Sequence, residues 1–121
     1  MKTSSTQEIK FVPKGWGFEK WIHNSKEYCG KLLYFVKGKC CSWHYHKIKD
    51  EVFYVQSGKI KLFYSESDDI TNAEIVILNP GENFHVYRGL RHRMEAIEDT
   101  ELFEFSTQHF DSDSHRIIKG D

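Results

Sequence analysis

Hydrophobic and polar residues alternate along most of the chain in short segments. In residues 59–64 (KIKLFY), Ile60, Leu62 and Tyr64 occupy every second position, and residues 101–106 (ELFEFS) alternate in the same way. Successive side chains of a β-strand point to opposite faces, so a period of two predicts strands with one buried face. Similar apolar runs predict further strands at residues 31–37, 52–55, 74–78 and 84–87.

Turn-forming residues separate these predicted strands. They are found at Gly38, at Ser57-Gly58, in the acidic stretch 65–72, at Asn79-Pro80-Gly81 and at Gly89. Strands that recur every ~8–12 residues with turns between them are typical of an antiparallel sandwich or barrel. No segment shows a long apolar period of 3.6 residues, so little helix is expected. The sequence therefore predicts an all-β protein.

The length of 121 residues fits one domain. Residues 1–10 are mostly polar and are expected to form a disordered tail, which leaves residues 11–121 as the single domain. The segment 15–22 (GWGFEKWI) is apolar enough to need a packing partner. That partner is either the same barrel or a second subunit, and the sequence alone leaves both open.

Charge and hydropathy exclude several classes of partner. Seventeen basic residues balance eighteen acidic ones, so the chain has no overall field that would attract nucleic acid or anionic lipid. No run approaches the ~18 apolar residues of a membrane span, and the first ten residues lack the apolar core of a secretory signal. We expect a cytoplasmic protein with no nucleic-acid or membrane partner.

Histidine is unusually frequent, with seven in the chain, and three of the seven are spaced in a way that suggests metal binding. His44 and His46 lie two residues apart, so on a strand both imidazoles project from one face. Glu51 follows after a short connection that can return as an antiparallel neighbour, and His92 lies in a later strand-like segment. Three imidazoles and one carboxylate suit Zn, Fe(II), Mn, Ni or Co. On spacing alone, His44 and His46 could equally be polar positions on a sheet surface.

The wider pattern resembles a known family. Gly38, His44, His46, Glu51 and Gly58 match every position of G-x5-H-x-H-x4-E-x6-G, which is the first motif of the cupin superfamily. In the second motif, G-x5-P-x-G-x2-H-x3-N, the chain matches both glycines and the histidine with Gly81, Gly89 and His92, but has Tyr87 for Pro and Ala96 for Asn. The resemblance implies a single-domain cupin, a double-stranded β-helix or jelly-roll barrel, with His44, His46, Glu51 and His92 as metal ligands.

From residue 13 to the C-terminus the chain is similar to the small mannose-6-phosphate isomerase-like cupins. That family usually has Gln as its first ligand, where this chain has His44. Its closing stretch, an acidic turn followed by Asp, a spacer and Arg, resembles residues 106–116 and implies a catalytic role for Arg116. A guanidinium there suits a substrate phosphate or a developing oxyanion. Histidines 23, 109 and 115 are expected to be solvated.

The resemblance implies an isomerase that acts on a sugar phosphate or a nucleotide-linked sugar, with a divalent metal as Lewis acid. Glu51 is the only acid that the motif itself supplies to the site, as ligand or as catalytic base. Two alternatives remain: a non-haem metal dioxygenase or lyase, and a non-enzymatic sugar-binding accessory cupin. Small cupins commonly pair, so a homodimer is expected, with the 15–22 segment covering a strand edge.

Overall fold

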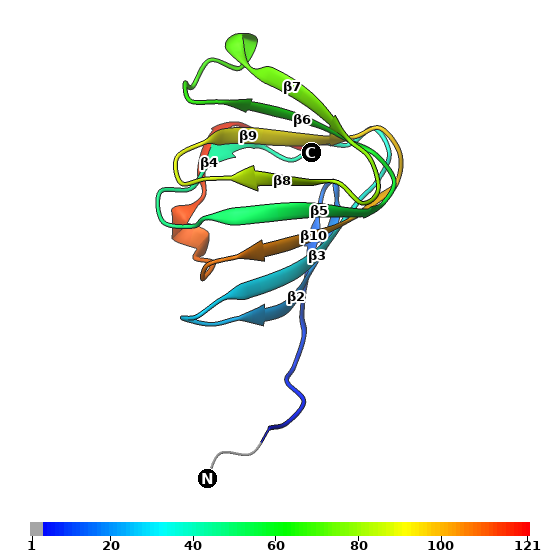
Figure 1. Cartoon of the computed structure of the whole chain (residues 1–121), viewed down its shortest axis with the longest axis vertical. Helices are drawn as coiled ribbons and strands as arrows, with labels where there is room; N and C mark the ends of the chain where they lie inside the picture. The colour runs from blue at the N-terminus through cyan, green and yellow to red at the C-terminus, as the bar shows by residue number, and fades with distance from the viewer. Residues whose placement is uncertain (1–3) are drawn as a thin grey trace.

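The computed structural model of the chain describes residues 4–121 and arranges them in two antiparallel β-sheets (Figure 1). The strands are β1 (Lys10–Lys14), β2 (Gly17–Asn24), β3 (Cys29–Phe35), β4 (Trp43–Tyr45), β5 (Glu51–Ser57), β6 (Ile60–Ser65), β7 (Glu74–Leu78), β8 (Asn83–Val86), β9 (Arg91–Ala96), β10 (Thr100–Ser106) and β11 (His115–Ile118). Helical structure in the described residues is limited to two short 3₁₀ turns, η1 (Ile70–Asn72) and η2 (Asp111–Asp113). The predicted all-β class is confirmed. Within residues 4–121, no helix is long and apolar enough to span a membrane.

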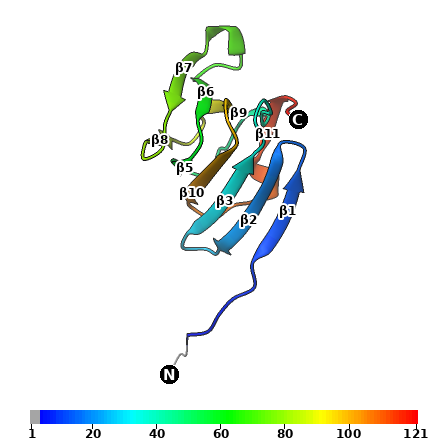
Figure 2. The same ribbon diagram turned by 90° about the vertical axis from the view of Figure 1, so that its right-hand side faces the viewer.

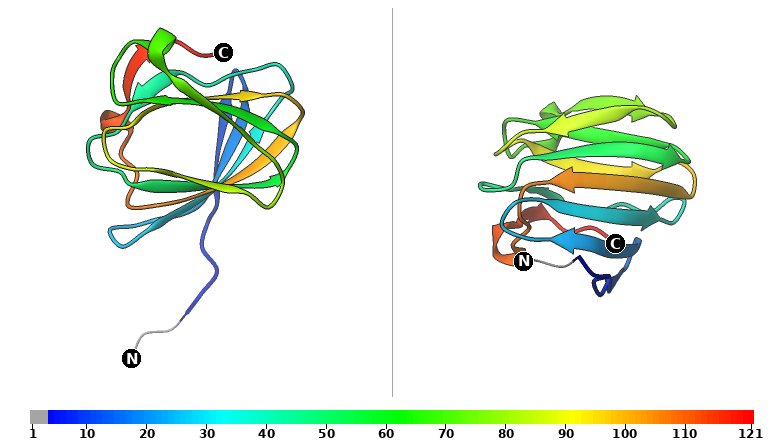
Figure 3. Two further views of the ribbon diagram at one scale, coloured as in Figure 1. Left: turned by 45° about the horizontal axis from the view of Figure 1, so that its top comes forward. Right: turned by 60° about the horizontal axis from the view of Figure 1, so that its bottom comes forward.

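The six-stranded sheet has the order β1-β2-β3-β10-β5-β8, and the five-stranded sheet has the order β11-β4-β9-β6-β7. Figure 2 shows β1, β2 and β3 side by side at one end of the larger sheet. The left view of Figure 3 shows strands of both sheets curling around a common axis. Strands adjacent in space are often distant in sequence, as β3 and β10 are. The barrel is therefore assembled by long-range pairing.

The predicted strands exist, and most of their boundaries shift by one or two residues. β7 has the bounds that the pattern predicts, whereas β3 begins and ends two residues before the predicted 31–37 segment. The predicted tail needs a similar adjustment, because β1 begins at Lys10, inside it. Residues 1–3 of that tail lie outside the described residues.

The apolar segment 15–22 packs on its own barrel. Trp16 is buried, and its ring stacks on Phe35 of β3 with the centroids 4.1 Å apart. Most of the remainder of the segment forms β2, which pairs with β1 and β3. The sequence left open whether this segment packs on the same barrel or on a second subunit. In the structure, Trp16 packs on the same barrel.

Alternation along the strands builds the core. β3, β5 and β10 each bury every second residue over most of their length, and these side chains face the barrel interior. The interior cluster is apolar, and its fully buried members include Phe35, Val55, Ile60, Leu62 and Leu102. Gly58 permits the tight turn between β5 and β6: its φ is 92°, and an added Cβ would lie 2.3 Å from the carbonyl oxygen of Asp99.

Toward one end of the barrel, the buried positions of the strands hold ionisable residues instead of apolar ones. There, the buried positions on the inner faces of β3, β5, β9 and β10 hold Lys31, Glu51, His92 and Glu104. Ionisable residues are rarely buried unless they are paired or bind a ligand. This end of the barrel is therefore the candidate for a functional site.

Candidate metal centre

Three imidazoles converge inside the barrel. His44 on β4 pairs directly with His92 on β9, and His46 follows β4 immediately. One ring nitrogen from each of the three histidines lies within 4.8 Å of the other two, an arrangement that can hold a metal ion. The structure thus brings together the three histidines that the sequence singles out, from β4, the residue that follows it, and the neighbouring strand β9.

Backbone carbonyl groups fix the orientation of each ring. The Nδ1 atoms of His44, His46 and His92 lie 2.9, 3.0 and 3.0 Å from the carbonyl oxygens of Ser42, Asp113 and Leu90. A carbonyl oxygen can only accept a hydrogen bond, so each Nδ1 carries the proton and donates it. The lone pair is then on Nε2, which is the form that binds a metal, with the carbonyl group as its outer partner.

Glu51 adds a carboxylate to this cluster. Its Oε2 atom lies 3.4 Å from the Nε2 atoms of both His46 and His92, and its Oε1 atom lies 3.3 Å from Nζ of Lys49. Oε2 of Glu51 and Nε2 of His92 are both buried and have no hydrogen-bond partner among the described residues. Unpartnered buried polar atoms are costly, and two of them facing each other fit a site whose missing partner is a cation. The donor set fits a divalent metal.

Burial sets the charge state of these ligands. Desolvation lowers the pKa of His92 to about 4 and moves the pKa of His44 and His46 well below the usual range. All three imidazoles are therefore neutral near pH 7. Burial also raises the pKa of Glu51 to about 8, although the Lys49 ammonium acts in the opposite direction. A cation that binds there must displace the proton of Glu51, so binding releases protons.

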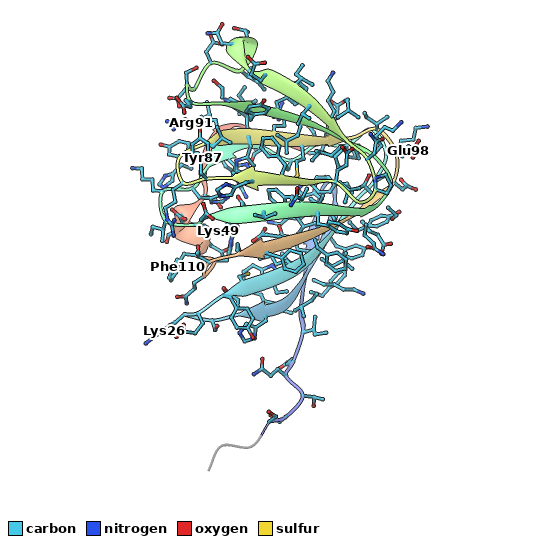
Figure 4. All side chains as sticks on the ribbon, in the orientation of Figure 1. Lys26, Lys49, Tyr87, Arg91, Glu98 and Phe110 are labelled. Carbon is cyan, nitrogen blue, oxygen red and sulfur yellow. The ribbon has the colours of Figure 1, made fainter. Side chains whose placement is uncertain are left out.

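Next to the ligands lies a buried charge network that the sequence pattern did not predict. Nζ of Lys49 lies 3.1 Å from Oε2 of Glu104 and 3.1 Å from Nδ1 of His109, in addition to its contact with Glu51. Figure 4 shows Lys49 at the same end of the molecule as Phe110, with Glu98 at the opposite end. The expectation that His109 is solvated is wrong, since only 10% of its side chain is exposed.

The sequence pattern does not reveal this network. In residues 100–106, the inward parity of Leu102 also contains Glu104, whereas the outward parity contains Phe103 and Phe105. The two phenylalanines make the outward parity the more apolar one, so hydropathy alone assigns the wrong face of this strand as buried. Lys49 gives no signal because it lies in the loop between β4 and β5.

Asp113 braces that loop. Its carboxylate accepts hydrogen bonds from the backbone N–H groups of Lys47, Ile48 and Lys49, at 2.9 to 3.2 Å. Its backbone carbonyl is the group that orients His46. The 3₁₀ turn η2 thus holds the loop between His46 and Glu51 in place from more than 60 residues away in sequence.

The ligands line a cavity of about 950 Å³ that extends between the two sheets. Arg116 also lines it, from β11, where it pairs with His44 of β4. Arg116 is exposed, and its positive charge contributes to the lowered pKa of His44, after burial, His92 and the Lys49 ammonium. All four predicted ligands and Arg116 therefore face one cavity. Such a volume accommodates a small organic molecule.

Comparison with protein families assigns residues 31–105, more than half of the chain, to Cupin_2, described as the cupin domain. The chain belongs to the cupin family. The predicted single-domain cupin barrel is confirmed, and the motif glycines and ligand positions 38–92 lie within the matched region. No curated protein matches the chain.

Solved structures share the fold at low sequence identity. The capsular polysaccharide assembling protein CapF from Staphylococcus aureus is 17% identical with a TM-score of 0.77, over 90% of this chain and 34% of CapF. KdgF from Halomonas sp. is 19% identical with a TM-score of 0.72, over 88% of this chain and 92% of KdgF. Oxalate decarboxylase from Bacillus subtilis is 15% identical with a TM-score of 0.79, over 93% of this chain and 31% of that enzyme. This cupin spans about a third of the length of CapF and of the decarboxylase.

Proposed function

We propose that this cupin is a metal-dependent enzyme that binds one divalent ion through His44, His46, Glu51 and His92. One observation carries the proposal: a ring nitrogen of each histidine lies within 4.8 Å of the other two, and Oε2 of Glu51 lies 3.4 Å from Nε2 of His46 and of His92. Two of these atoms, Oε2 of Glu51 and Nε2 of His92, have no partner among the described residues. The N/O donor set suits Zn, Fe(II), Mn or Ni. A bound ion would supply Lewis-acid polarisation of substrate oxygens.

We propose aldose–ketose isomerisation of a sugar phosphate or nucleotide-linked sugar as the reaction. This reaction moves a proton between neighbouring carbons and needs a base. Glu51 is committed to the ligand set, and Glu104 is another buried carboxylate that lines the cavity. Burial alone would raise the pKa of Glu104, but the ammonium groups of Lys49 and Lys31 outweigh it and lower this pKa. Glu104 is therefore ionised at neutral pH, which is the charge state that a base requires.

Arg116 has a separate role in this proposal. Its guanidinium lines the cavity from the strand next to His44, so it is placed to bind an oxyanion that develops on the substrate. Two further points support a carbohydrate substrate: the family resemblance of the closing stretch, and the shared fold of CapF, a capsular polysaccharide assembling protein. A cytoplasmic location stays a prediction.

A lyase or metal oxygenase is the second candidate. Oxalate decarboxylase from Bacillus subtilis shares this fold with a TM-score of 0.79, and its name denotes the decarboxylation of a small dicarboxylate. The same ligand set supports such chemistry if the ion is redox-active. Oxygen consumption or carbon dioxide release on addition of candidate substrates separates this alternative from isomerisation, which involves neither.

The first test is elemental analysis of protein purified without an affinity tag. We expect about one divalent metal ion per chain, lost in His46→Ala and retained in His85→Ala, an exposed histidine on the outer face. Full metal occupancy in a variant with alanine at His44, His46, Glu51 and His92 would rule out the site.

The second test is a substrate screen with the metal-loaded protein and a panel of sugar phosphates and nucleotide sugars. Glu104→Gln should keep the metal and lose isomerisation by at least about a hundredfold, which is the usual contribution of a general base. Binding without turnover across the panel would favour the accessory sugar-binding role over the enzyme.

We also propose that the chain forms a homodimer through the outer face of the six-stranded sheet. Aromatic side chains gather on that face: the rings of Phe18 and Tyr34 stack 5.2 Å apart, and Phe11 contacts Phe18 at 5.0 Å. Phe103 and Phe105 continue the surface on β10, with Phe105 57% exposed. Contiguous exposed apolar surface of this kind marks interaction sites.

A further inference from the structure

Two lysines are buried in the barrel, and their surroundings differ. Nζ of Lys49 meets three acceptors, Glu51, Glu104 and His109, which match its three N–H donors. Lys31 is only 2% exposed, yet no acceptor among residues 4–121 lies within hydrogen-bond distance of its Nζ. The nearest carboxylate oxygen, Oε1 of Glu19, is 3.6 Å away.

The groups around Lys31 do not accept hydrogen bonds from its ammonium. Oε1 of Glu19 already accepts a hydrogen bond of 2.8 Å from the indole Nε1 of Trp21. The ammonium of Lys31 lies 4.3 Å from the Trp21 ring centroid, and the ammonium of Lys10 lies 4.4 Å from the same centroid. All four side chains line the cavity that holds the metal ligands. Lys31 thus has a single ion pair of 3.6 Å with Glu19, and its ammonium, which faces the cavity, makes no hydrogen bond within residues 4–121.

The strand register sets these groups in one row. Lys10 of β1 pairs with Trp21 of β2, Trp21 pairs with Lys31 of β3, and Lys31 pairs with Glu104 of β10. The next strand in the sheet is β5, which carries Glu51. With neighbouring strands about 4.8 Å apart, Lys31 is about 10 Å across the sheet from the strand that carries Glu51. This separation suits a ligand that reaches from the metal centre with one end and places a charged group at the other.

We propose that Lys31, together with Lys10 and Trp21, forms a subsite for an oxyanion, the carboxylate or phosphate group of the substrate. The inference rests on the proposed function, in that it names the anionic end of the molecule whose other end meets the metal ligands. The N–H donors of Lys31 make no hydrogen bond within residues 4–121, and hydrogen bonds from an ammonium to an oxyanion are among the strong ones. The indole ring of Trp21 holds both ammonium groups close to the subsite through cation–π contacts.

The subsite would decide specificity. A neutral ligand would leave the Lys31 ammonium with only its 3.6 Å contact to Glu19, whereas an anionic one would accept its hydrogen bonds. Arg116 lies on the five-stranded sheet and Lys31 on the six-stranded sheet, so the two cations contact the ligand from different walls. Lys31 would thus bind a terminal oxyanion of the substrate, and Arg116 would bind negative charge that develops on the substrate near the metal ligands.

Binding at this subsite can be measured without metal. The indole N–H resonance of Trp21 in ¹⁵N-labelled protein, assigned by its absence in Trp21→Phe, reports on the subsite directly. Metal-free protein, dialysed free of chelator, is titrated with inorganic phosphate and, separately, with acetate at constant ionic strength. We expect a saturable shift of this resonance with at least one of the two, and the tighter of the two identifies the oxyanion as phosphate or carboxylate.

Lys31→Met keeps the length of the side chain and removes the charge. It should raise the Kd for the better anion at least about tenfold, the usual effect of losing a hydrogen bond to a charged group. The matched control is Lys20→Met, an exposed lysine of β2 on the opposite face of the sheet, and it should leave the Kd unchanged. No shift in the wild type with either anion, or a Kd in Lys31→Met within about twofold of the wild type, would overturn the subsite.

Folding of Lys31→Met is checked by circular dichroism. If this variant does not fold, Lys10→Met replaces it, because Lys10 is exposed and its loss should raise the Kd about threefold or more; an unchanged Kd then overturns the subsite. The titration needs no metal ion. A chain that binds no metal would therefore contradict the proposed function and leave this result intact.

Discussion

Lys49 shows how much a single residue contributes to the geometry of the centre. Glu51 and Glu104 are both buried carboxylates, and Lys49 contacts one oxygen of each. Its hold on Oε1 of Glu51 leaves Oε2 to face the imidazoles. Removing one partner of such a buried group costs about 3–5 kcal/mol because it leaves uncompensated charge. Lys49 is thus a positioning residue, whereas Lys31 makes only a 3.6 Å ion pair with Glu19 and no hydrogen bond among the described residues, so it can bind a ligand.

Protonation of the histidines should make the metal-free protein sensitive to acid. The pKa of His92 is about 4 in the folded state, against an ordinary value of 6.5 in the unfolded state. Between these two values the unfolded chain binds the extra proton, so the free energy of unfolding falls as the pH drops from 6.5 to about 4. For His92 alone the loss is of the order of 3 kcal/mol. His44 and His46 act in the same direction, and Glu51, with its raised pKa, acts in the opposite one.

Urea unfolding of metal-free protein at pH 7 and pH 4 isolates the His92 contribution when it is compared with His92→Gln. The wild type should lose about 3 kcal/mol more than His92→Gln between the two pH values. His85→Gln, which changes an exposed histidine, should behave like the wild type. Equal losses in the wild type and His92→Gln would show that His92 is not held neutral.

At the scale of elements, the alternation of apolar and polar residues predicts the strands, because this pattern depends only on residues close together in the sequence. It also places His44 and His46 on one face before any pairing is known. It cannot predict which strands pair, since β3 contacts β10 and β4 contacts β9 across long stretches of chain. Residues whose roles depend on such pairings, among them Lys49, Lys31 and Glu104, therefore could not be identified from the sequence.

The conformation of the loop between β4 and β5 could not be predicted from the local sequence, because it depends on Asp113, which is more than 60 residues away. Asp113→Ala would leave three backbone N–H groups of that loop without their acceptor and would release the loop between His46 and Glu51. We expect a loss of about 2–4 kcal/mol in the free energy of unfolding. Metal affinity should fall about 10–100-fold, as it does when outer-sphere partners of ligands are removed.

Denaturant unfolding and isothermal titration with Zn²⁺ measure the two effects. Ser112→Ala is the matched control, because Ser112 belongs to the same 3₁₀ turn and is exposed. It should change both quantities only slightly. Unaltered Zn²⁺ affinity in a folded Asp113→Ala protein would show that the loop holds the ligands without this carboxylate.

At the scale of the whole molecule, the two edges and the outer face of the six-stranded sheet are the candidate surfaces for pairing. β1 forms one edge, and Pro13 within it removes a backbone donor, which disfavours the addition of another strand there. The outer face lacks such a block. Its aromatic side chains run from Phe11 on β1 to Phe105 on β10, so a second copy can cover them in an isologous interface.

A charge on this face should dissociate the dimer. In Phe105→Lys, pairing would bring two ammonium groups, one from each copy, into an apolar interface, which is costly without compensation. Analytical ultracentrifugation should give a dimer for the wild type and a monomer for Phe105→Lys at the same micromolar concentration. Ile75→Lys changes a 52% exposed apolar residue on β7 of the other sheet and should remain dimeric. A monomeric wild type would show that no copy covers this face in solution. A Phe105→Lys dimer as stable as the wild type would show that the dimer forms through another surface.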